Sequence, residues 1–467
     1  MESRIDHQQR ENRIDLESYK GKKVFFCGIG GTSMSGLAQI CRAQGYDVLG
    51  SDRGESPFTH ELTAEGIEVR IGQRAENVQG IDLFVYSAAI HPDNPERAEA
   101  TRLGIPQMER SVLLGKISAH YEQVVAIAGG HGKTTTSSML ALICMEGGLD
   151  PTVHVGGMVP FLHGGVRIGH SQLFITEACE YVESFMTLHP SLISINNIDD
   201  DHLDYFRDID HITDTFARFI DLLPEGKPLF GCTDDARVTA LMQRCGRPTF
   251  SFGLHSGDLR AESTQTTASG GQTFRVVEKG QHLFDVTLQM PGLHNVVDAL
   301  CAIAIARYLG VDDNSIVRAL ANYTLTGRRF EKMGEVDGVM IYHDYAHHPT
   351  EIATCLAGAR SVCKGTLYAV LQCNSYTRAK TLFSGTVDCF GAANEVIVPD
   401  IFPGRETDDG SIHARDIAQA IHSGGTPARY IDTFEEIATY LRSVWQPGDL
   451  VITLGSGDVY FQTRKLL

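Results

Sequence analysis

Val124-Val-Ala-Ile-Ala-Gly-Gly-His-Gly-Lys-Thr-Thr-Thr-Ser137 is the stretch of sequence from which the fold follows. Its apolar run ends at Ala128 and predicts a buried strand, and the glycines after it predict a turn. The apolar segment 139–143 then predicts a helix. A turn between a strand and a helix directs several backbone N–H groups and a helix N-terminus at one point, which favours a phosphate site.

The residues of this turn indicate how a phosphate would be bound. Lys133 supplies a positive charge for the β- and γ-phosphates, and the Thr134 hydroxyl is placed to reach Mg²⁺. The match to the P-loop motif is partial, because Ala128 stands where the first glycine is expected. A plain surface turn is the alternative. We interpret these residues as the nucleotide-binding loop: Gly129, Gly130, His131, Gly132, Lys133, Thr134 and Thr135.

Length and composition limit the classes of protein that need to be considered. The 467 residues predict two to four domains. A hydrophobic fraction of 42% and a charged fraction of 21% are typical of a soluble globular protein. The net charge of −18 argues against nucleic acid as a partner, since a phosphate backbone needs a basic surface. It leaves open a small phosphorylated ligand, for which one local cluster of Lys and Arg is enough.

Targeting features point to the cytoplasm. Residues 1–18 are polar, so they predict no signal peptide and read as a frayed leader. No apolar run reaches the length of about 18 residues that a membrane span needs, so we expect no membrane insertion. The 11 cysteines include no CxxC pair, which favours reduced thiols.

The first predicted domain covers residues 20–119 and begins with a strand that runs into a glycine turn. The segments 23–31, 34–41 and 46–52 predict strand, helix and strand, and Asp52 ends the second strand. This order predicts a Rossmann-like parallel sheet. The glycines are off the dinucleotide pattern, so either NAD or another nucleotide diphosphate fits. Ser87 is one of the small polar residues near the end of the predicted buried strand 81–90, where it is either a ligand contact or an ordinary strand cap. The glycines of the turn and helix are Gly28, Gly30, Gly31 and Gly36.

The second predicted domain, residues 120–327, carries carboxylates where a nucleotide's metal would lie. The strand 173–177 ends on Glu177, which predicts a Mg²⁺ contact beside the phosphate loop. The acidic segment 199–204 contains His202, a natural metal ligand among acids. A solvated acidic turn is the alternative for this segment. Further on, His294 and Asn295 begin an apolar helix, where Asn295 either pairs with an adenine edge or caps the helix.

The third predicted domain, residues 328–467, again alternates strands and helices and predicts a doubly wound sheet. Arg328-Arg329 is either a hinge or a phosphoryl contact. Asp344 and His347-His348 suggest zinc, but the expected spacing of further ligands is absent nearby.

The ordered motifs resemble those of the Mur ligases over nearly the whole chain. They are Gly28-Ile-Gly-Gly-Thr-Ser-Met-Ser-Gly36, Gly130-His-Gly-Lys-Thr-Thr-Thr136, Glu177-Ala-Cys-Glu-Tyr181, Asp201-His-Leu-Asp204, Gly292-Leu-His-Asn295, Arg328-Arg-Phe-Glu331 and Asp344-Tyr-Ala-His-His-Pro-Thr-Glu351. The resemblance implies an α/β protein of three domains: a Rossmann-like UDP-sugar domain, a P-loop ATPase-like central domain and a Rossmann-like C-terminal domain that binds an amino acid.

The resemblance also implies a reaction. We expect the carboxylate of UDP-N-acetylmuramate to attack the γ-phosphate of ATP, with Mg²⁺ as cofactor, to give an acyl phosphate. An amino acid, expected to be L-alanine, then forms the amide during peptidoglycan precursor synthesis. Catalysis of this kind depends on positioning and charge neutralisation.

Roles follow from the resemblance residue by residue. Lys133 would stabilise the transferred phosphoryl group. Thr134 and Glu177 would hold one Mg²⁺, and His202 would hold a second. His294 and Asn295 would meet the adenine, Arg329 the γ-phosphate and Asp344 the ribose. His348 and Arg378 would face the amino acid. The expected UDP-sugar contacts are Gly28, Gly30, Gly31, Ser35, Gly36, Asp52 and Ser87.

Three positions depart from the family pattern. Gly130 replaces a usual Thr, and Asp298 stands where a second Asn is common. The segment Gln372-Cys-Asn-Ser-Tyr-Thr-Arg378 lacks positive charge that the family often has there. The alternatives are therefore a sister ligase that adds another amino acid or a peptide, a non-catalytic UDP-sugar-binding paralogue, and an NAD-dependent dehydrogenase with an ATPase domain. The sequence predicts neither the oligomeric state nor carbamylation of a lysine.

Overall fold

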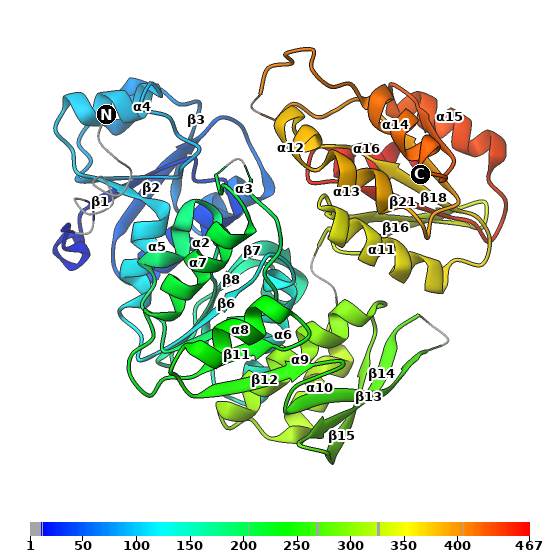
Figure 1. Cartoon of the computed structure of the whole chain (residues 1–467). Helices are drawn as coiled ribbons and strands as arrows, with labels where there is room; N and C mark the ends of the chain where they lie inside the picture. The colour runs from blue at the N-terminus through cyan, green and yellow to red at the C-terminus, as the bar shows by residue number, and fades with distance from the viewer. Residues whose placement is uncertain (1–10, 12, 204, 268–269, 325–326, 405) are drawn as a thin grey trace. The chain divides into compact units, whose positions relative to one another are not determined.

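The computed structural model describes residues 11, 13–203, 205–267, 270–324, 327–404 and 406–467 (Figure 1). These residues form two compact units. The first unit contains the chain up to Ile198, Asp210–Phe252 and Cys301–Ile316, and the second contains Asp199–Ile209, Gly253–Leu300 and Val317–Leu467.

The first unit begins with a five-stranded parallel sheet in the order β3-β2-β1-β4-β5. Strand β1 is buried over four of its five residues, which is typical of a parallel strand covered on both faces. Its Phe25 stacks on Phe84 of β4, with ring centroids 5.8 Å apart. The strands are β1 (Lys23–Cys27), β2 (Asp47–Asp52), β3 (Glu68–Ile71), β4 (Leu83–Tyr86) and β5 (Gln107–Glu109). The helices are α2 (Thr32–Ala43), α3 (Pro57–Ala64), α4 (Pro95–Arg102) and α5 (Arg110–Ser118).

This strand order reverses direction between β1 and β4, which is the point where ligands bind in doubly wound sheets. The Rossmann-like prediction for this part of the chain is therefore confirmed.

The central sheet of the first unit runs in the order β12-β11-β10-β6-β9-β7-β8, parallel except for its edge strand β8. Strand β6, which carries the predicted phosphate loop, lies between β10 and β9. The strands are β6 (Gln123–Ala128), β7 (Thr152–Val159), β8 (Gly164–Arg167), β9 (Leu173–Glu177), β10 (Leu192–Ile195), β11 (Leu229–Cys232) and β12 (Thr249–Gly253). The helices of this region are α6 (Lys133–Glu146), η4 (Tyr181–Thr187), α7 (Ile209–Ile220), α8 (Ala236–Arg244), α9 (Leu293–Tyr308) and α10 (Asp313–Asn322).

The second unit contains an antiparallel group of three strands and a sheet of six strands in the order β16-β17-β21-β18-β19-β20. Only β16 is antiparallel in the six-stranded sheet. The strands are β13 (Leu259–Thr266), β14 (Gln272–Glu278), β15 (Gln281–Leu288), β16 (Glu331–Val336), β17 (Val339–Asp344), β18 (Leu367–Leu371), β19 (Glu395–Val398), β20 (Ala428–Tyr430) and β21 (Leu450–Leu454). The helices are α11 (Pro349–Val362), α12 (Tyr376–Thr381), α13 (Phe383–Asp388), α14 (Ala414–Ser423), α15 (Phe434–Val444) and α16 (Val459–Gln462).

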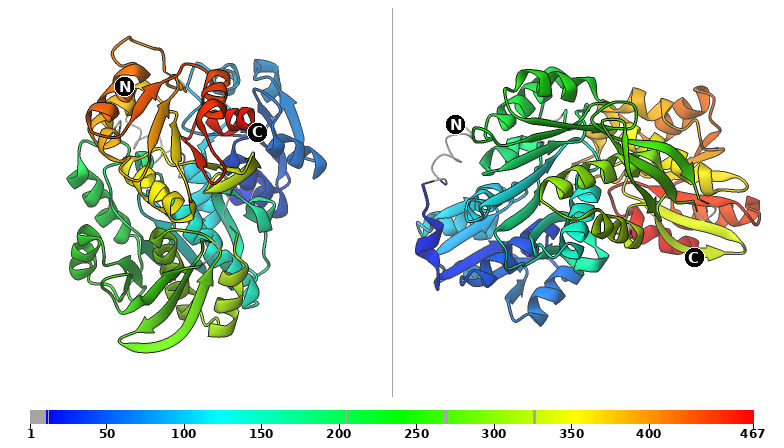
Figure 2. Two further views of the ribbon diagram at one scale, coloured as in Figure 1. Left: turned by 90° about the vertical axis from the view of Figure 1, so that its right-hand side faces the viewer. Right: turned by 90° about the horizontal axis from the view of Figure 1, so that it is seen from below.

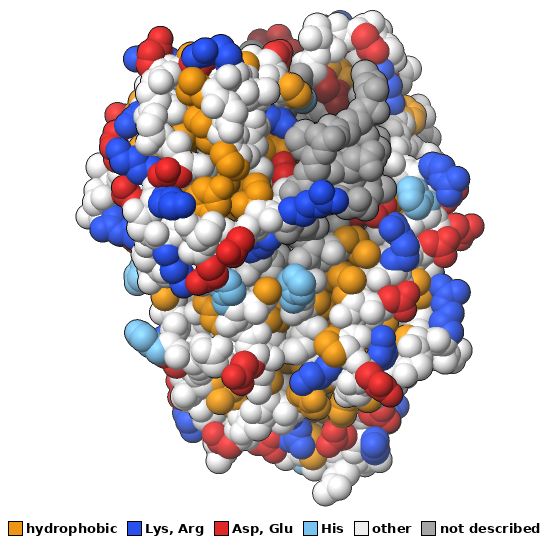
Figure 3. Space-filling model, turned by 90° about the vertical axis from the view of Figure 1, so that its left-hand side faces the viewer, with side chains coloured by type: hydrophobic (Ala, Val, Ile, Leu, Met, Phe, Trp, Pro, Cys, Tyr) orange, Lys and Arg blue, Asp and Glu red, His pale blue; other side chains and the backbone are white. Residues whose placement is uncertain are grey.

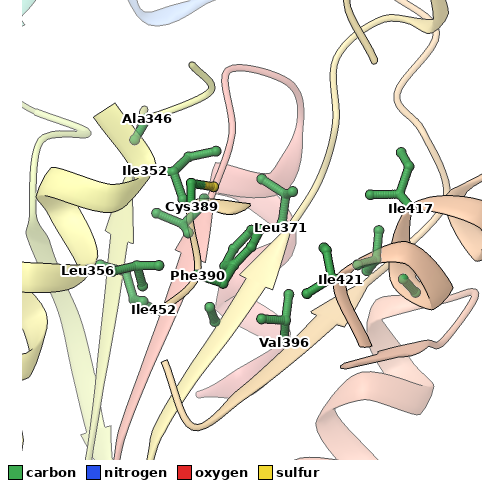
Figure 4. Close-up of a cluster of buried hydrophobic side chains, with 14 of the residues drawn as sticks. Ala346, Ile352, Leu356, Leu371, Cys389, Phe390, Val396, Ile417, Ile421 and Ile452 are labelled. Atoms are coloured by element: carbon green, nitrogen blue, oxygen red, sulfur yellow. The ribbon is translucent and has the colours of Figure 1, made fainter. Parts of the chain in front are cut away.

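Helices cover both faces of the six-stranded sheet (Figure 2). On one face, Leu356 of α11 and Ile421 of α14 pack with Phe390 and Val396 into a buried cluster (Figure 4). On the other face, helices α15 and α16 contribute the buried side chains. Burial on both faces explains the near-continuous apolar strands and confirms the doubly wound prediction.

The predicted three-part α/β fold is thus present, with one sheet for each part. The boundaries 20–119, 120–327 and 328–467 stay predictions, because the compact units group the first sheet with the parallel part of the central one. In the described residues, no helix is long and apolar enough to cross a membrane. On the face shown in Figure 3, acidic and basic side chains are interspersed.

The leader is more ordered than predicted in its described residues. Leu16 is 3% exposed and Glu11 is 4% exposed. The Glu11 carboxylate accepts hydrogen bonds from the Tyr86 hydroxyl at 2.7 Å and the Glu109 N–H at 2.8 Å. These contacts lie at the carboxyl ends of β4 and β5, and the polar sequence of the leader does not predict them.

Buried His343 makes the stability of the second unit sensitive to acid. Its Nδ1 lies 3.0 Å from the Thr453 hydroxyl, and its Nε2 has no hydrogen-bond partner among the described residues. Burial first, and then the charges of Arg328 and Arg329, lower the pKa of His343 to about 3. The folded state therefore keeps the imidazole neutral, whereas the unfolded chain binds a proton below about pH 6.5.

We predict that the contribution of neutral His343 to the free energy of unfolding is complete above pH 6.5 and is lost as the pH falls toward 3. At pH 5 this single group lowers the free energy of unfolding by about 2 kcal/mol. Denaturant unfolding at pH 7 and pH 5 measures it. The variant His343→Gln, which does not titrate, should lose less stability over this interval than the wild type; an equal loss in both would contradict the assignment.

Candidate active site

The predicted phosphate loop is a turn between β6 and α6, as the sequence indicated. Gly129 and Gly132 have φ of +138° and +82°, which favours glycine at both positions. Gly132 is the residue before the first turn of α6, and Lys133 begins the helix. Backbone N–H groups at the start of this helix are therefore free of helical partners and suit a phosphate.

Two asparagines that the sequence analysis did not select hold this loop. Asn197 accepts the N–H of His131 at its side-chain oxygen (2.8 Å) and donates its amide to the His131 carbonyl (3.1 Å). The Asn196 amide donates to the Thr136 hydroxyl at 2.7 Å. Both asparagines follow β10, whose Ile195 pairs with Ala128 of β6. Their position directly after β10, the strand next to β6, is the sequence signal that could have identified them as site residues.

Lys133 is turned toward its own loop and toward an acid. Its Nζ donates to the carbonyls of Gly129 and Gly130 and lies 3.0 Å from Glu180. Burial alone would lower the pKa of Lys133, but the Glu180 charge raises it by more, so the pKa lies above its usual value. The side chain is therefore an ammonium held beside the phosphate loop. Glu180 was not among the predicted site residues.

Thr134 and Glu177 each lie against one of two adjacent glycines of β7. The Glu177 carboxylate accepts the Gly156 N–H at 3.0 Å. A Cβ on Gly156 would lie 3.0 Å from Glu177 Oε2, and a Cβ on Gly157 would lie 2.8 Å from the methyl carbon Cγ2 of Thr134. The two glycines thus leave room for Glu177 and Thr134, whose carboxylate and hydroxyl are oxygen donors of the kind that fits Mg²⁺.

His202 belongs to the second unit, and its predicted role as a ligand of a second Mg²⁺ stays a prediction. Its φ is +57°, its N–H donates to Asp201 Oδ1 at 2.7 Å, and its Nε2 lies 3.7 Å from Asp201 Oδ2. Burial raises the pKa of Asp201, but His202 and then Arg378 lower it by more, so the carboxyl stays ionised. Asp204 of the same motif lies outside the described residues.

The glycine turn of the first domain is organised by Asp52. The Gly30 N–H donates to Asp52 Oδ2 at 2.8 Å, and Gly28 has φ of +78°. A Cβ on Gly30 would lie 2.7 Å from Thr59 Cγ2, so only glycine fits. Gly31 precedes α2. The structure therefore brings these predicted glycines and Asp52 into one turn at the carboxyl end of β1.

Other predicted UDP-sugar residues have local roles. The buried Ser35 donates its hydroxyl to the Thr32 carbonyl, and Gly36 packs on His154. The Ser87 carbonyl accepts the Ile90 N–H just after β4, which matches the alternative that Ser87 is an ordinary strand cap. A hollow of about 440 Å³ beyond the carboxyl ends of these strands was not predicted; its polar lining includes Arg53, Gln73, His91 and Asn94.

The predicted adenine and ribose contacts lie in the second unit. Asn295 is buried and donates its amide to the Pro291 carbonyl at 2.6 Å, which favours its alternative as a support for the helix start. His294 is exposed and lies against Gly292. Asp344 accepts the N–H groups of Phe330 and Ala346 at 2.7 Å each.

The second unit contains the predicted amino-acid contacts, His348 and Arg378, and the predicted γ-phosphate contact, Arg329. His348 precedes this helix, and its Nε2 lies 3.0 Å from the Asp200 carbonyl. Arg329 lies 3.7 Å from Glu351. Arg378 lies 3.8 Å from Asp201. It also lines a small hollow, formed within the second unit, with His347, Cys373, Asn374, Leu382 and Thr386.

Parallel sheets that carry a lysine-containing phosphate loop and a glycine turn are typical of enzymes that bind nucleotides. Family models match most of the chain: "Mur ligase family, catalytic domain" at residues 23–122, "Mur ligase middle domain" at 127–306 and "Mur ligase, glutamate ligase domain" at 328–457. The chain belongs to the Mur ligase family and is an ATP-dependent ligase.

Named relatives match over nearly their full length. UDP-N-acetylmuramate–L-alanine ligase of Acetivibrio thermocellus is 43% identical over 447 residues, 95% of each chain. The ligase of the same name from Clostridium beijerinckii is 41% identical over 96% of this chain and 98% of its own. The crystal structure of UDP-N-acetylmuramate–alanine ligase from Thermotoga maritima is similar with a TM-score of 0.81 at 25% identity, covering 95% of this chain and 98% of that one.

We predict that Asn197→Ala weakens ATP binding by releasing the backbone of His131. Two hydrogen bonds are lost, so the KM for ATP should rise about 10-fold or more, while the KM for the second nucleotide ligand stays the same. Steady-state kinetics measure both constants. The exposed Asn322→Ala in α10 is the control. An unchanged KM for ATP would show that the loop does not depend on this clamp.

Proposed function

We propose that this protein joins L-alanine to the carboxylate of UDP-N-acetylmuramate, at the expense of ATP, in peptidoglycan precursor synthesis. The observation that carries the proposal is the identity above 40% with ligases of that name over at least 95% of each chain. ATP and the UDP-sugar are cytoplasmic metabolites, and we place the enzyme in the cytoplasm with them.

In the first step the sugar-linked carboxylate attacks the γ-phosphate, and ADP leaves. Lys133, already an ammonium beside the loop, neutralises the charge of the transferred phosphoryl group. For this role the lysine exchanges its contact with Glu180 for the phosphate. The backbone N–H groups of Gly132 and the first turn of α6 orient the phosphates.

Thr134 and Glu177 would hold one Mg²⁺, and His202 would hold a second. The fit at the first ion rests on the room that Gly156 leaves for the Glu177 carboxylate and Gly157 leaves for the Thr134 side chain. Bound there, Mg²⁺ would neutralise phosphate charge.

The remaining predicted residues serve the other two ligands. The turn of Gly28, Gly30 and Gly31, with Asp52 behind it, would receive the UDP diphosphate at the start of α2. His348 and Arg378 would meet the amino acid, whose amine attacks the acyl phosphate and releases phosphate.

A second candidate function follows from the hollow beside Arg378. Cys373 and Asn374 line it and carry no charge. A substrate carboxylate there has one arginine to pair with, and Arg378 is already 3.8 Å from Asp201. This favours, as the alternative, a sister ligase that adds another amino acid or a peptide to the UDP-sugar.

The amine donor is tested by phosphate release from ATP and Mg²⁺ with UDP-N-acetylmuramate and each of the twenty amino acids. We expect turnover with L-alanine. Turnover with a different amino acid or with a peptide would support the sister ligase. UDP-sugar binding with no phosphate release under any condition would support a non-catalytic paralogue.

We predict that Lys133→Ala lowers kcat about 1,000-fold, because a charge that neutralises the phosphoryl group is removed. The exposed Lys364→Ala should leave kcat unchanged. Phosphate release measures both variants. A Lys133→Ala enzyme with more than a tenth of the wild-type rate would exclude this role for the lysine.

We predict that Gly156→Ala raises the Mg²⁺ concentration needed for half-maximal activity by about 10-fold, because the added methyl would lie 3.0 Å from Glu177 Oε2 and displace the carboxylate. The matched control is Gly391→Ala, where nothing lies within 4 Å of the added Cβ. A Mg²⁺ titration of the rate measures the effect. Equal requirements in the two variants would count against Glu177 as a metal ligand.

A further inference from the structure

Arg110 lies beside the helix start that follows the glycine turn of the first domain. It begins helix α5, directly after β5, and is half-buried. Its guanidinium donates to the Ser33 hydroxyl at 3.1 Å. Ser33 is the second residue of α2, two positions after Gly31. Arg110 therefore contacts the helix start that would receive the nucleotide sugar in the proposed function.

The first turn of α5 also contacts the segment that follows Glu180. The Thr187 hydroxyl of η4 donates to the Ser111 carbonyl at 2.7 Å. The backbone of Gly115 lies so close to Thr187 that a Cβ would be 2.1 Å from its carbonyl oxygen. Helix α5 thus braces the chain next to Glu180, the acid that holds Lys133.

Arg110 keeps most of its donors available. Among the described residues no carboxylate forms an ion pair with it, and Ser33 uses one of its five N–H groups. The Ser33 hydroxyl also lies 3.1 Å from Nε2 of the buried His154, which in turn lies beside Thr176 of β9. Burial, and then Arg110, lower the pKa of His154 to about 4, so this neighbour is neutral at pH 7.

We propose that Arg110 binds the carboxylate of the UDP-sugar and positions it between the glycine turn and Lys133. This inference rests on the proposed function. A guanidinium accepts a carboxylate with two parallel hydrogen bonds, which fixes both its position and its orientation. The diphosphate has its own donors in the turn at Gly28–Gly31 and α2, whereas α5 packs on η4, the segment directly after Glu180. The ligand of Arg110 is the group that reacts.

Binding of two nucleotide sugars without ATP tests this assignment. UDP-N-acetylmuramate carries the carboxylate, and UDP-N-acetylglucosamine shares the nucleotide and sugar but lacks it. We expect Arg110→Gln to weaken binding of UDP-N-acetylmuramate about 30-fold and to leave the affinity for UDP-N-acetylglucosamine unchanged in calorimetric titrations. Arg110→Lys, which keeps the charge, should recover part of the loss.

The control is Arg102→Gln, an exposed arginine of the same domain that pairs with Glu99. It should change neither affinity. Equal weakening of both sugars by Arg110→Gln would mean that Arg110 binds the shared diphosphate or supports the fold, and no weakening would mean that it contacts neither; each result overturns the proposal. A wild-type protein that fails to bind UDP-N-acetylmuramate at all would instead overturn the proposed function.

Discussion

A largely buried ammonium group has to be paired, and the pairing of Lys133 organises the candidate site. The lysine begins α6, its Nζ binds the carbonyls of its own loop, and Glu180 neutralises its charge. Because β6 pairs with β9 in parallel, Glu177 at the end of β9 and Glu180 just after it lie beside this loop. The positive charge is therefore kept in place, and a phosphate has to compete with Glu180 for it.

Two glycine turns of the kind that binds phosphate lie in the same compact unit, and both are built in the same way. Each joins the carboxyl end of a parallel strand to a helix N-terminus, at Gly28–Gly31 and at Gly129–Gly132. Each is also held from a neighbouring strand, by Asp52 at the end of β2 and by Asn197 after β10. Helix α5 contacts the start of α2 through Arg110 and the end of η4 through Ser111. The strands and helices of one compact unit can thus position both a nucleotide sugar and a nucleoside triphosphate.

The sequence predicted what is local and missed what depends on strand order. Glycines, Lys133 and the apolar strand before them identify the loop without any structure, and the apolar strands of residues 328–467 predict the doubly wound sheet. Asn197 and Glu180 were missed because their contacts exist only when β10 and β9 flank β6. The Glu11 carboxylate was missed because a polar leader carries no periodic signal for its binding to Tyr86.

Isotope transfer shows whether the UDP-sugar carboxylate attacks the γ-phosphate of ATP. UDP-N-acetylmuramate labelled with ¹⁸O in its carboxylate is turned over with ATP, Mg²⁺ and L-alanine, and the released phosphate is analysed by mass spectrometry. An acyl phosphate transfers one carboxylate oxygen to phosphate, so we predict one ¹⁸O in each phosphate released. Phosphate without the label would contradict the account, because ATP would then be hydrolysed without activating the carboxylate.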